Sequence, residues 1–382
     1  MGDRRTQGEG MSDYPDRIID DDRLAALMRA LADDGYRLAG PTVADGAVTL
    51  DLIDGLDDLP DGGVDEQAPG RYRYDPTGGE GRRFAYVVGP QSWKRFLFPP
   101  EQTLFTVTKE GPSFTVEPPE PAPAPYAFIG VRPCELSAMA AHDQIFTGGA
   151  AVDTPYADRR SGVFVAAVNC ARPGGACFCA SMGTGPTARS GFDIALTELA
   201  GRRYLATTGS DRGAALLDRI GAGEADESDR AEADAVMDAA ARRMGKQLAT
   251  DGLPEALAAA ADLSAWKEVG ERCLSCGNCA LVCPTCFCSV VVDANDLTGD
   301  RSRRVRRWDV CFTTDFSYVH GGAVRTSSAA RYRHWITHKL STWHDQFGRS
   351  GCVGCGRCVT WCPVGIDIVA EATRVMEERE GR

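Results

Sequence analysis

Eight cysteines in the last third of the chain follow one spacing that occurs twice. They are Cys273, Cys276, Cys279 and Cys283, followed by Pro284, and Cys352, Cys355, Cys358 and Cys362, followed by Pro363. Each copy reads C-x2-C-x2-C-x3-C-P. In chains with this spacing, three cysteines bind one [4Fe–4S] cluster and the fourth binds the other cluster. We therefore predict a first cluster bound by Cys273, Cys276, Cys279 and Cys362, and a second bound by Cys283, Cys352, Cys355 and Cys358.

The residues around the cysteines fit this interpretation. Gly277 and Gly356 follow the second cysteine of each copy, where a residue without Cβ lets the backbone turn tightly around an inorganic core. A pair of zinc sites is the alternative, but zinc sites usually use paired C-x2-C knuckles. Four thiolates per cluster leave no iron open to a substrate. The pattern therefore predicts electron transfer without bond chemistry, and no catalytic residue is assigned.

Seven further cysteines lie outside the two motifs. Four are in the N-terminal part and form a candidate third site: Cys134, Cys170, Cys177 and Cys179. A third [4Fe–4S] cluster, a zinc site and plain buried thiols are all compatible with them. Three more follow the first motif: Cys286, Cys288 and Cys311. These either complete or substitute in a third site, or pack as thiols around the clusters, and the second interpretation is favoured.

A basic run lies between the two motifs in a chain whose net charge is −12. It contains Arg301, Arg303, Arg304, Arg306 and Arg307. One interpretation is a solvated loop. The other is that these arginines offset the negative charge of the clusters or dock an acidic partner.

Bulk properties exclude several classes of protein. The negative charge disfavours nucleic acid as a partner, because phosphates repel such a surface. No apolar run approaches the roughly 20 residues that span a bilayer, so no membrane association is predicted. Arg4-Arg5 is followed by polar residues rather than by the apolar core of an export signal. Fifteen cysteines, mostly in tight groups, then indicate metal ligation in a reducing cytoplasm.

The predicted organisation has three parts. Residues 1–19 read as a disordered polar tail. Residues 20–250 read as an α+β or α/β domain with an amphipathic helix from Asp20, strand-like runs at 48–53, 84–88, 104–107, 126–131, 163–168, 192–196 and 203–207, and a proline-rich connector at 117–125. Residues 251–382 read as a mainly α-helical two-cluster ferredoxin domain, with a long insertion between Cys283 and Cys352. No glycine-rich nucleotide motif follows any strand, so FAD and NAD are not expected to bind this chain.

Several segments resemble a known family. They are G-P-Q-S-W-K-R-F-L-F-P-P at 89–100, G-V-R-P-C at 130–134, N-C at 169–170, C-F-C at 177–179, C-P-T-C-F-C at 283–288, W-D at 308–309 and C-V-G-C-G-R-C at 352–358. With them the chain resembles the β subunits of sulfhydrogenases and NAD(P)-linked [NiFe] hydrogenases, and the related A subunit of anaerobic sulfite reductase. The resemblance extends over about residues 20–376.

The resemblance implies a cytoplasmic, non-catalytic electron-transfer subunit. Its partners would be a flavin and NAD(P)H-binding subunit and the small and large subunits of a [NiFe] hydrogenase, with no nickel bound by this chain. A sulfite reductase, in which the partner carries sirohaem, is the alternative. An iron–sulfur redox sensor or assembly module is an alternative of another class. All three alternatives are compatible with the sequence.

Overall fold

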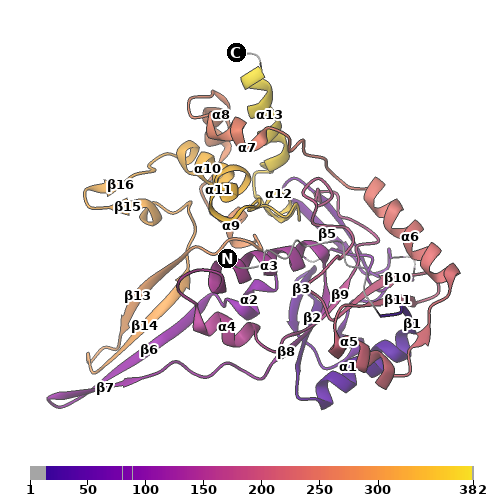
Figure 1. The fold of residues 1–382 in the computed structure, drawn as a ribbon. Helices are drawn as coiled ribbons and strands as arrows, with labels where there is room; N and C mark the ends of the chain where they lie inside the picture. The colour runs from indigo at the N-terminus through magenta and orange to yellow at the C-terminus, as the bar shows by residue number, and fades with distance from the viewer. Residues whose placement is uncertain (1–13, 80, 88, 381–382) are drawn as a thin grey trace, which may run out of the picture.

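The computed structural model describes residues 14–79, 81–87 and 89–380, and confirms the expected mixed α/β architecture (Figure 1). Its main sheet has eight strands in the order β12-β1-β11-β10-β9-β8-β2-β3. The neighbours β2, β8, β9 and β10 run parallel, and the other pairs are antiparallel. The strands are β1 (Arg17–Asp20), β2 (Arg37–Ala44), β3 (Ala47–Leu52), β8 (Tyr126–Val131), β9 (Phe164–Val168), β10 (Ile194–Glu198), β11 (Arg203–Thr208) and β12 (Gly223–Glu224).

Helices cover both faces of this sheet. α1 (Asp21–Asp33) and α5 (Asp211–Arg219) contribute to one apolar core, and α3 (Pro133–Thr147) and α4 (Thr154–Arg160) contribute to the other. Along β9, Phe164 and Ala166 belong to the first core and Val165 to the second. Strands buried on both faces are typical of parallel sheets in α/β proteins, and explain the continuous apolar runs in the sequence.

The predicted amphipathic helix is confirmed as α1. The Asp20 side chain accepts a hydrogen bond from the Arg23 N–H at 3.0 Å and caps the helix, and Leu24, Leu27 and Leu31 are buried. The predicted tail lies mostly outside the described residues. Its last part was wrong, however, because Arg17–Asp20 form β1 between β11 and β12.

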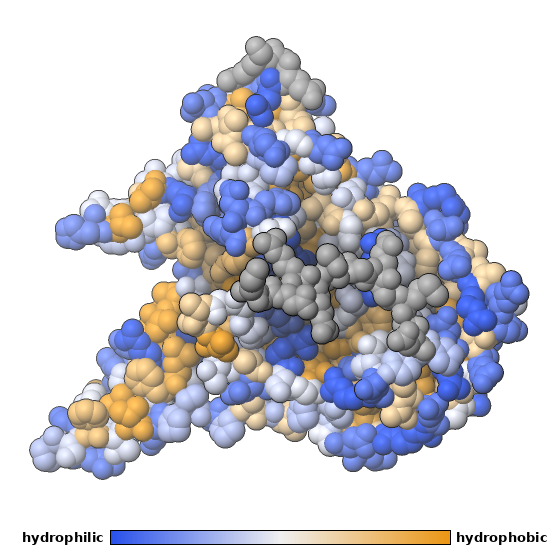
Figure 2. All heavy atoms as spheres, in the orientation of Figure 1, coloured by the Kyte–Doolittle hydropathy of each residue, from blue (hydrophilic) through white to orange (hydrophobic). Residues whose placement is uncertain are grey.

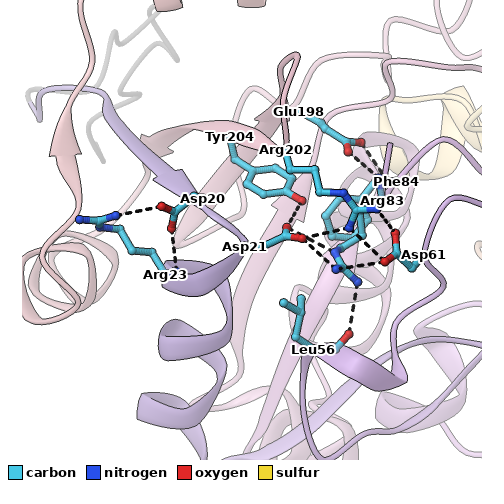
Figure 3. A network of polar contacts seen from close by, with 10 residues as sticks. All are labelled: Asp20, Asp21, Arg23, Leu56, Asp61, Arg83, Phe84, Glu198, Arg202 and Tyr204. Atoms are coloured by element: carbon cyan, nitrogen blue, oxygen red, sulfur yellow. Dashed lines mark hydrogen bonds and ion pairs between the residues drawn. The ribbon is translucent and has the colours of Figure 1, made fainter. Parts of the chain in front are cut away.

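The predicted strand at 84–88 was also wrong for the residues described. The Phe84 N–H donates to Glu198 Oε2 at 3.0 Å, and the Val87 N–H donates to Asp65 Oδ1 at 2.6 Å. Buried carboxylates thus satisfy backbone groups that a strand would offer to a neighbouring strand. The Glu198 contact belongs to a polar network in which Asp21 of α1 accepts from Tyr204 of β11 and from Arg83 (Figure 3).

A second sheet joins parts of the chain that are far apart in sequence. Its order is β13-β14-β6-β7, and in Figure 1 it forms an arm at the lower left. The strands are β6 (Glu101–Glu110), β7 (Ser113–Glu117), β13 (Ser289–Asn295) and β14 (Arg301–Trp308). β6 from the N-terminal half pairs with β14 from between the cysteine motifs, so this sheet crosses the predicted domain boundary at 250/251. Figure 2 shows apolar surface along the arm, where Phe105, Val290 and Val291 are exposed.

Short helices and loops carry the cysteine motifs and pack around a third apolar core, at the top of Figure 1. The helices are α7 (Leu253–Ala258), α8 (Ala265–Arg272), α9 (Asn278–Leu281), α10 (Ser328–Thr337), the π-helical turn η3 (His338–Thr342), α11 (Trp343–Phe347), α12 (Arg357–Thr360) and α13 (Ile368–Glu380). Within the predicted helical domain, the insertion carries β13 and β14 and the hairpin β15 (Tyr318–Val319) and β16 (Gly322–Ala323).

The remaining elements connect these layers. They are η1 (Leu56–Asp58), η2 (Asp315–Ser317), α2 (Lys94–Leu97), α6 (Glu227–Arg242) and the hairpin β4 (Val64–Ala68) and β5 (Arg71–Asp75). The proline-rich residues 118–125 have no regular structure between β7 and β8. Among the described helices, none has the length and apolar character needed to cross a membrane.

Candidate metal centres

The structure brings the four cysteines predicted for the first cluster to one pocket. Cys273, Cys276 and Cys279, from the loop after α8 and from α9, line it together with Cys362, which follows α12. Aromatic and aliphatic side chains complete the wall, among them Phe312, Tyr332, Trp335, Ile366 and Ile368. The pocket reaches the surface, because Cys276 is exposed.

The four cysteines predicted for the second cluster also come together. The thiols of Cys352, Cys355 and Cys283 interact electrostatically with the thiol of Cys358. Cys358 interacts with Cys279 as well and borders the first pocket, so the two groups are neighbours. The arrangement is the one that exchange of the fourth cysteine between the motifs requires.

The local backbone suits thiolate ligands. Three N–H groups donate to cysteine sulfurs: Ser275 to Cys273 at 3.4 Å, Gly354 to Cys352 at 3.4 Å and Ile366 to Cys362 at 3.3 Å. Gly277 and Gly356 both have φ of +74°, and a Cβ on Gly356 would lie 2.5 Å from the Ala176 carbonyl oxygen. Such N–H···S bonds and tight turns fit the surroundings of an iron–sulfur core.

The protonation of these thiols depends on whether a metal is bound. Burial raises the pKa of Cys352 to about 12 and the pKa of Cys358 well above its ordinary value. A metal must therefore displace the protons for these cysteines to bind as thiolates. Within the described residues, no three His, Cys, Asp or Glu side chains are placed to hold a single metal ion.

The candidate third site is also assembled. Cys134 lies in the first turn of α3, Cys170 follows β9, and Cys177 and Cys179 lie in the next loop. The Cys179 thiol interacts with those of Cys170 and Cys134, and the Cys177 thiol with those of Cys179 and Cys170.

The third site touches the second motif. The Cys177 Sγ lies 3.7 Å from the Cys355 carbonyl oxygen. Gly354 has φ of +64°, and a Cβ there would lie 2.6 Å from Cys179 Cα. Four thiols of the N-terminal half are thus adjacent to the second cysteine group.

The other three cysteines lie around the two main groups rather than with the N-terminal four. Cys286 hydrogen-bonds to Cys283, and this bond, against the effect of burial, holds the pKa of the Cys283 thiol well below its ordinary value. Cys311 interacts with Cys288 and with Cys279. Cys286 and Cys311 therefore lie next to cysteines of the first motif.

The arginine run is strand β14, not a loop, and most of its charges are matched locally. Arg304 pairs with Asp293 at 3.1 Å and Arg307 with Glu101 at 2.9 Å. Arg306 pairs with Asp153, and Arg301 lies 3.8 Å from Glu117. Arg303 has no ion pair with another described residue and lines a surface pocket beside Arg301 and Glu120. Partners already present at Arg304, Arg306 and Arg307 weaken the case that these arginines balance cluster charge.

Two buried lysines at the second cysteine group were not predicted as site residues. Lys339, in the π-helical turn η3, places its Nζ 3.1 Å from Thr285 Oγ1, and Thr285 Oγ1 is 3.2 Å from Cys283 Sγ. Lys94 of α2 donates to the carbonyl oxygens of Cys283 and Cys286, both at 3.1 Å. Lys94 lies in a family-like segment, which was the one sequence signal that pointed to it.

A buried ion pair lies on the other side of the same group. Arg357 of α12 pairs with Glu135 of α3, and both residues are at most 3% exposed. Burial raises the pKa of the Glu135 carboxyl, and the Arg357 charge opposes this shift. Arg357 Nε also donates to the Gly89 carbonyl oxygen at 3.0 Å. The pair therefore connects the N-terminal half to the second motif.

Known proteins match both the motifs and most of the chain. A family model described as a 4Fe-4S dicluster domain matches residues 272–366, which include all eight motif cysteines. Sulfhydrogenase 2 subunit beta of Pyrococcus furiosus is 31% identical over 292 residues, covering 75% of this chain and 83% of that protein. No solved structure matches. The C-terminal part is thus an iron–sulfur domain, as its cysteine spacing predicted.

Proposed function

Because this chain belongs to the family of sulfhydrogenase β subunits and carries a 4Fe-4S dicluster domain, we propose that it relays single electrons within a [NiFe] hydrogenase complex. One observation carries the proposal: two complete four-cysteine groups lie side by side, and Cys358 contacts both. When bound, [4Fe–4S] clusters supply one-electron chemistry. The cysteines hold the clusters, and the surrounding apolar and N–H groups keep them in place.

We assign the ligands as the sequence predicts. Cys273, Cys276, Cys279 and Cys362 bind the first cluster, and Cys283, Cys352, Cys355 and Cys358 bind the second. The exposed Cys276, beside Leu274 with 63% of its surface exposed, is where a redox partner can approach the first site.

We further propose a third [4Fe–4S] cluster bound by Cys134, Cys170, Cys177 and Cys179. Its support is the convergence of these four thiols and their contact with the Cys355 loop. A third cluster there would extend the relay from the second site into the N-terminal half of the chain. The three sites would then form one row, beginning at the exposed Cys276 edge.

Cluster content and single cysteine variants test these assignments. Iron and acid-labile sulfide near eight each per chain indicate two clusters, and about twelve each indicate three. Cys276→Ser and Cys355→Ser should each impair one cluster and block electron flow through the complex, while Cys288→Ser, outside the assigned groups, serves as the matched control. A chain that contains zinc in place of iron contradicts the proposal, as does full electron flow in both variants.

The partners are tested by reduction of the purified chain. We propose a flavin and NAD(P)H-binding subunit on one side and [NiFe] hydrogenase subunits on the other, as the sulfhydrogenase relative suggests. Bleaching of the iron–sulfur absorbance by NAD(P)H with the flavin subunit, and by hydrogen with the hydrogenase subunits, is expected. Oxidation of the reduced chain by a sirohaem subunit and sulfite, with no response to hydrogen, would instead establish the sulfite reductase alternative.

A further inference from the structure

Lys339 places a buried ammonium group beside the second cysteine group. Only 4% of the residue is exposed. Its Nζ contacts Thr285 Oγ1 at 3.1 Å and the Gly351 carbonyl oxygen at 3.4 Å, next to Cys352. The residue lies in a π-helical turn, an uncommon conformation that is frequent at functional sites. The turn directs the lysine toward the cysteines rather than toward water.

Lys94 reaches the same group from the N-terminal half and is 5% exposed. Its Nζ contacts the Cys283 and Cys286 carbonyl oxygens and lies 3.9 Å from the centre of the Trp308 ring. Two cationic side chains from segments far apart in sequence therefore converge on Cys283.

Neither lysine forms an ion pair with a carboxylate among the described residues. Glu135, the nearby buried acid, pairs with Arg357. A buried charge is costly unless an opposite charge compensates it. The cysteine thiols are the groups of potentially negative charge that both lysines face, and Lys94 also feels the more distant Glu135.

The first cysteine group has different surroundings. Its pocket is lined by aliphatic and aromatic side chains, and no described lysine or arginine lines it. Cys276 is exposed there, and charge at a solvent-exposed site is stabilised by the high dielectric constant of water. The buried second site lacks this contact, and burial alone disfavours the more negative, reduced form of a cluster.

We propose that Lys339 and Lys94 raise the reduction potential of the cluster held by Cys283, Cys352, Cys355 and Cys358. The inference rests on the proposed function for the presence of that cluster. Reduction adds one electron from a donor such as reduced flavin, and no bond forms or breaks. The two positive charges stabilise the added negative charge. Their effect is electrostatic: they bring the reduction potential of the buried second cluster closer to that of the first cluster, whose site is exposed.

Potentiometric titration of the full chain, followed by electron paramagnetic resonance, tests this role. The signal of the second cluster is identified as the one altered in Cys355→Ser and kept in Cys276→Ser. At the wild-type midpoint, Lys339→Met should lower the reduced-to-oxidised ratio of that cluster at least tenfold, equivalent to a midpoint about 59 mV lower for a one-electron couple. Lys94→Met should change the ratio in the same direction at least threefold.

Three controls keep the outcomes distinct. Lys109→Met removes the same charge from the exposed arm and should leave the ratio unchanged. Lys339→Arg keeps the charge and should restore most of the wild-type ratio. If Lys339→Met keeps the wild-type iron content and the midpoint potential of its second cluster does not change, the inference about the lysines is overturned while the proposed function stands. The same holds if the midpoints of both clusters change equally. If Lys339→Met loses its iron, the inference is tested with Lys94→Met instead: an unchanged midpoint potential of the second cluster at wild-type iron content overturns it. Absence of clusters from the wild-type chain overturns the proposed function instead.

Discussion

Replacing Arg357 by methionine should destabilise the protein strongly, because it removes one member of a buried ion pair. Glu135 would keep one hydrogen bond, from the Trp93 N–H at 3.3 Å, but would lose its only ion-pair partner among the described residues. Breaking a buried pair in this way costs about 3–5 kcal/mol. With an urea m-value of about 3 kcal/mol/M, the unfolding midpoint would fall by about 1–1.7 M.

The assay is anaerobic urea unfolding followed by tryptophan fluorescence, with the iron content of each variant measured beforehand. Arg307→Met is the matched control, because Arg307 and Glu101 are each nearly half exposed and such a pair contributes about 0–1 kcal/mol. The double variant Glu135→Leu/Arg357→Met should recover most of the loss, since an apolar pair leaves no charge unpaired. A midpoint for Arg357→Met no lower than that of Arg307→Met would refute the reasoning, and so would a double variant no more stable than the single one.

Three further perturbations test other parts of the structure. Leu27→Ala leaves a cavity beneath the main sheet and should lower the free energy of unfolding in urea by about 2–5 kcal/mol without changing the iron content. An unchanged unfolding midpoint would contradict the close packing of α1 against the sheet. Gly354→Ala places a methyl group against the Cys179 backbone and should lower the iron content per chain. Gly348→Ala, whose added methyl group meets nothing within 4 Å, should keep the wild-type iron content. Equal iron content in the two variants would argue against the close contact at Gly354. Burial lowers the pKa of His142 to about 3. Below pH 6.5 the unfolded chain therefore binds a proton that the folded chain does not, and the free energy of unfolding decreases as the pH is lowered. Between pH 6.5 and 5 the wild type should lose about 2 kcal/mol more than His142→Phe, measured by urea midpoints at each pH; parallel pH profiles would contradict this.

The iron–sulfur character of the C-terminal part could be predicted because the information for it is local. The spacing from Cys273 to Cys283, repeated from Cys352 to Cys362, is itself the signature of a two-cluster domain. The helix at Asp20 was equally readable, since its cap and its apolar spacing lie within a few residues of one another. Such features need no knowledge of what packs against them.

The surroundings of the second site could not be predicted, because they depend on contacts across the whole chain. Lys94 meets Cys283, and Arg357 meets Glu135 and Gly89, only after the sheet and the helices have packed together. The same cause explains the error at Phe84, whose N–H is taken by Glu198, more than one hundred residues away. The arginine run was misread for a related reason, since its strand partner β6 lies about two hundred residues earlier.

The pairing of β6 with β14 also limits how the chain can be divided. During synthesis, β6 has only β7 beside it until β14 has been made, so one row of its backbone N–H and C=O groups stays open for about half of translation. An open strand edge is prone to pair with other chains. A fragment that ends at residue 250 would keep that edge permanently, together with the exposed Phe105, and should self-associate in gel filtration where the full chain does not. The pairing of β6 with β14 therefore ties together two halves that read as separate units in sequence.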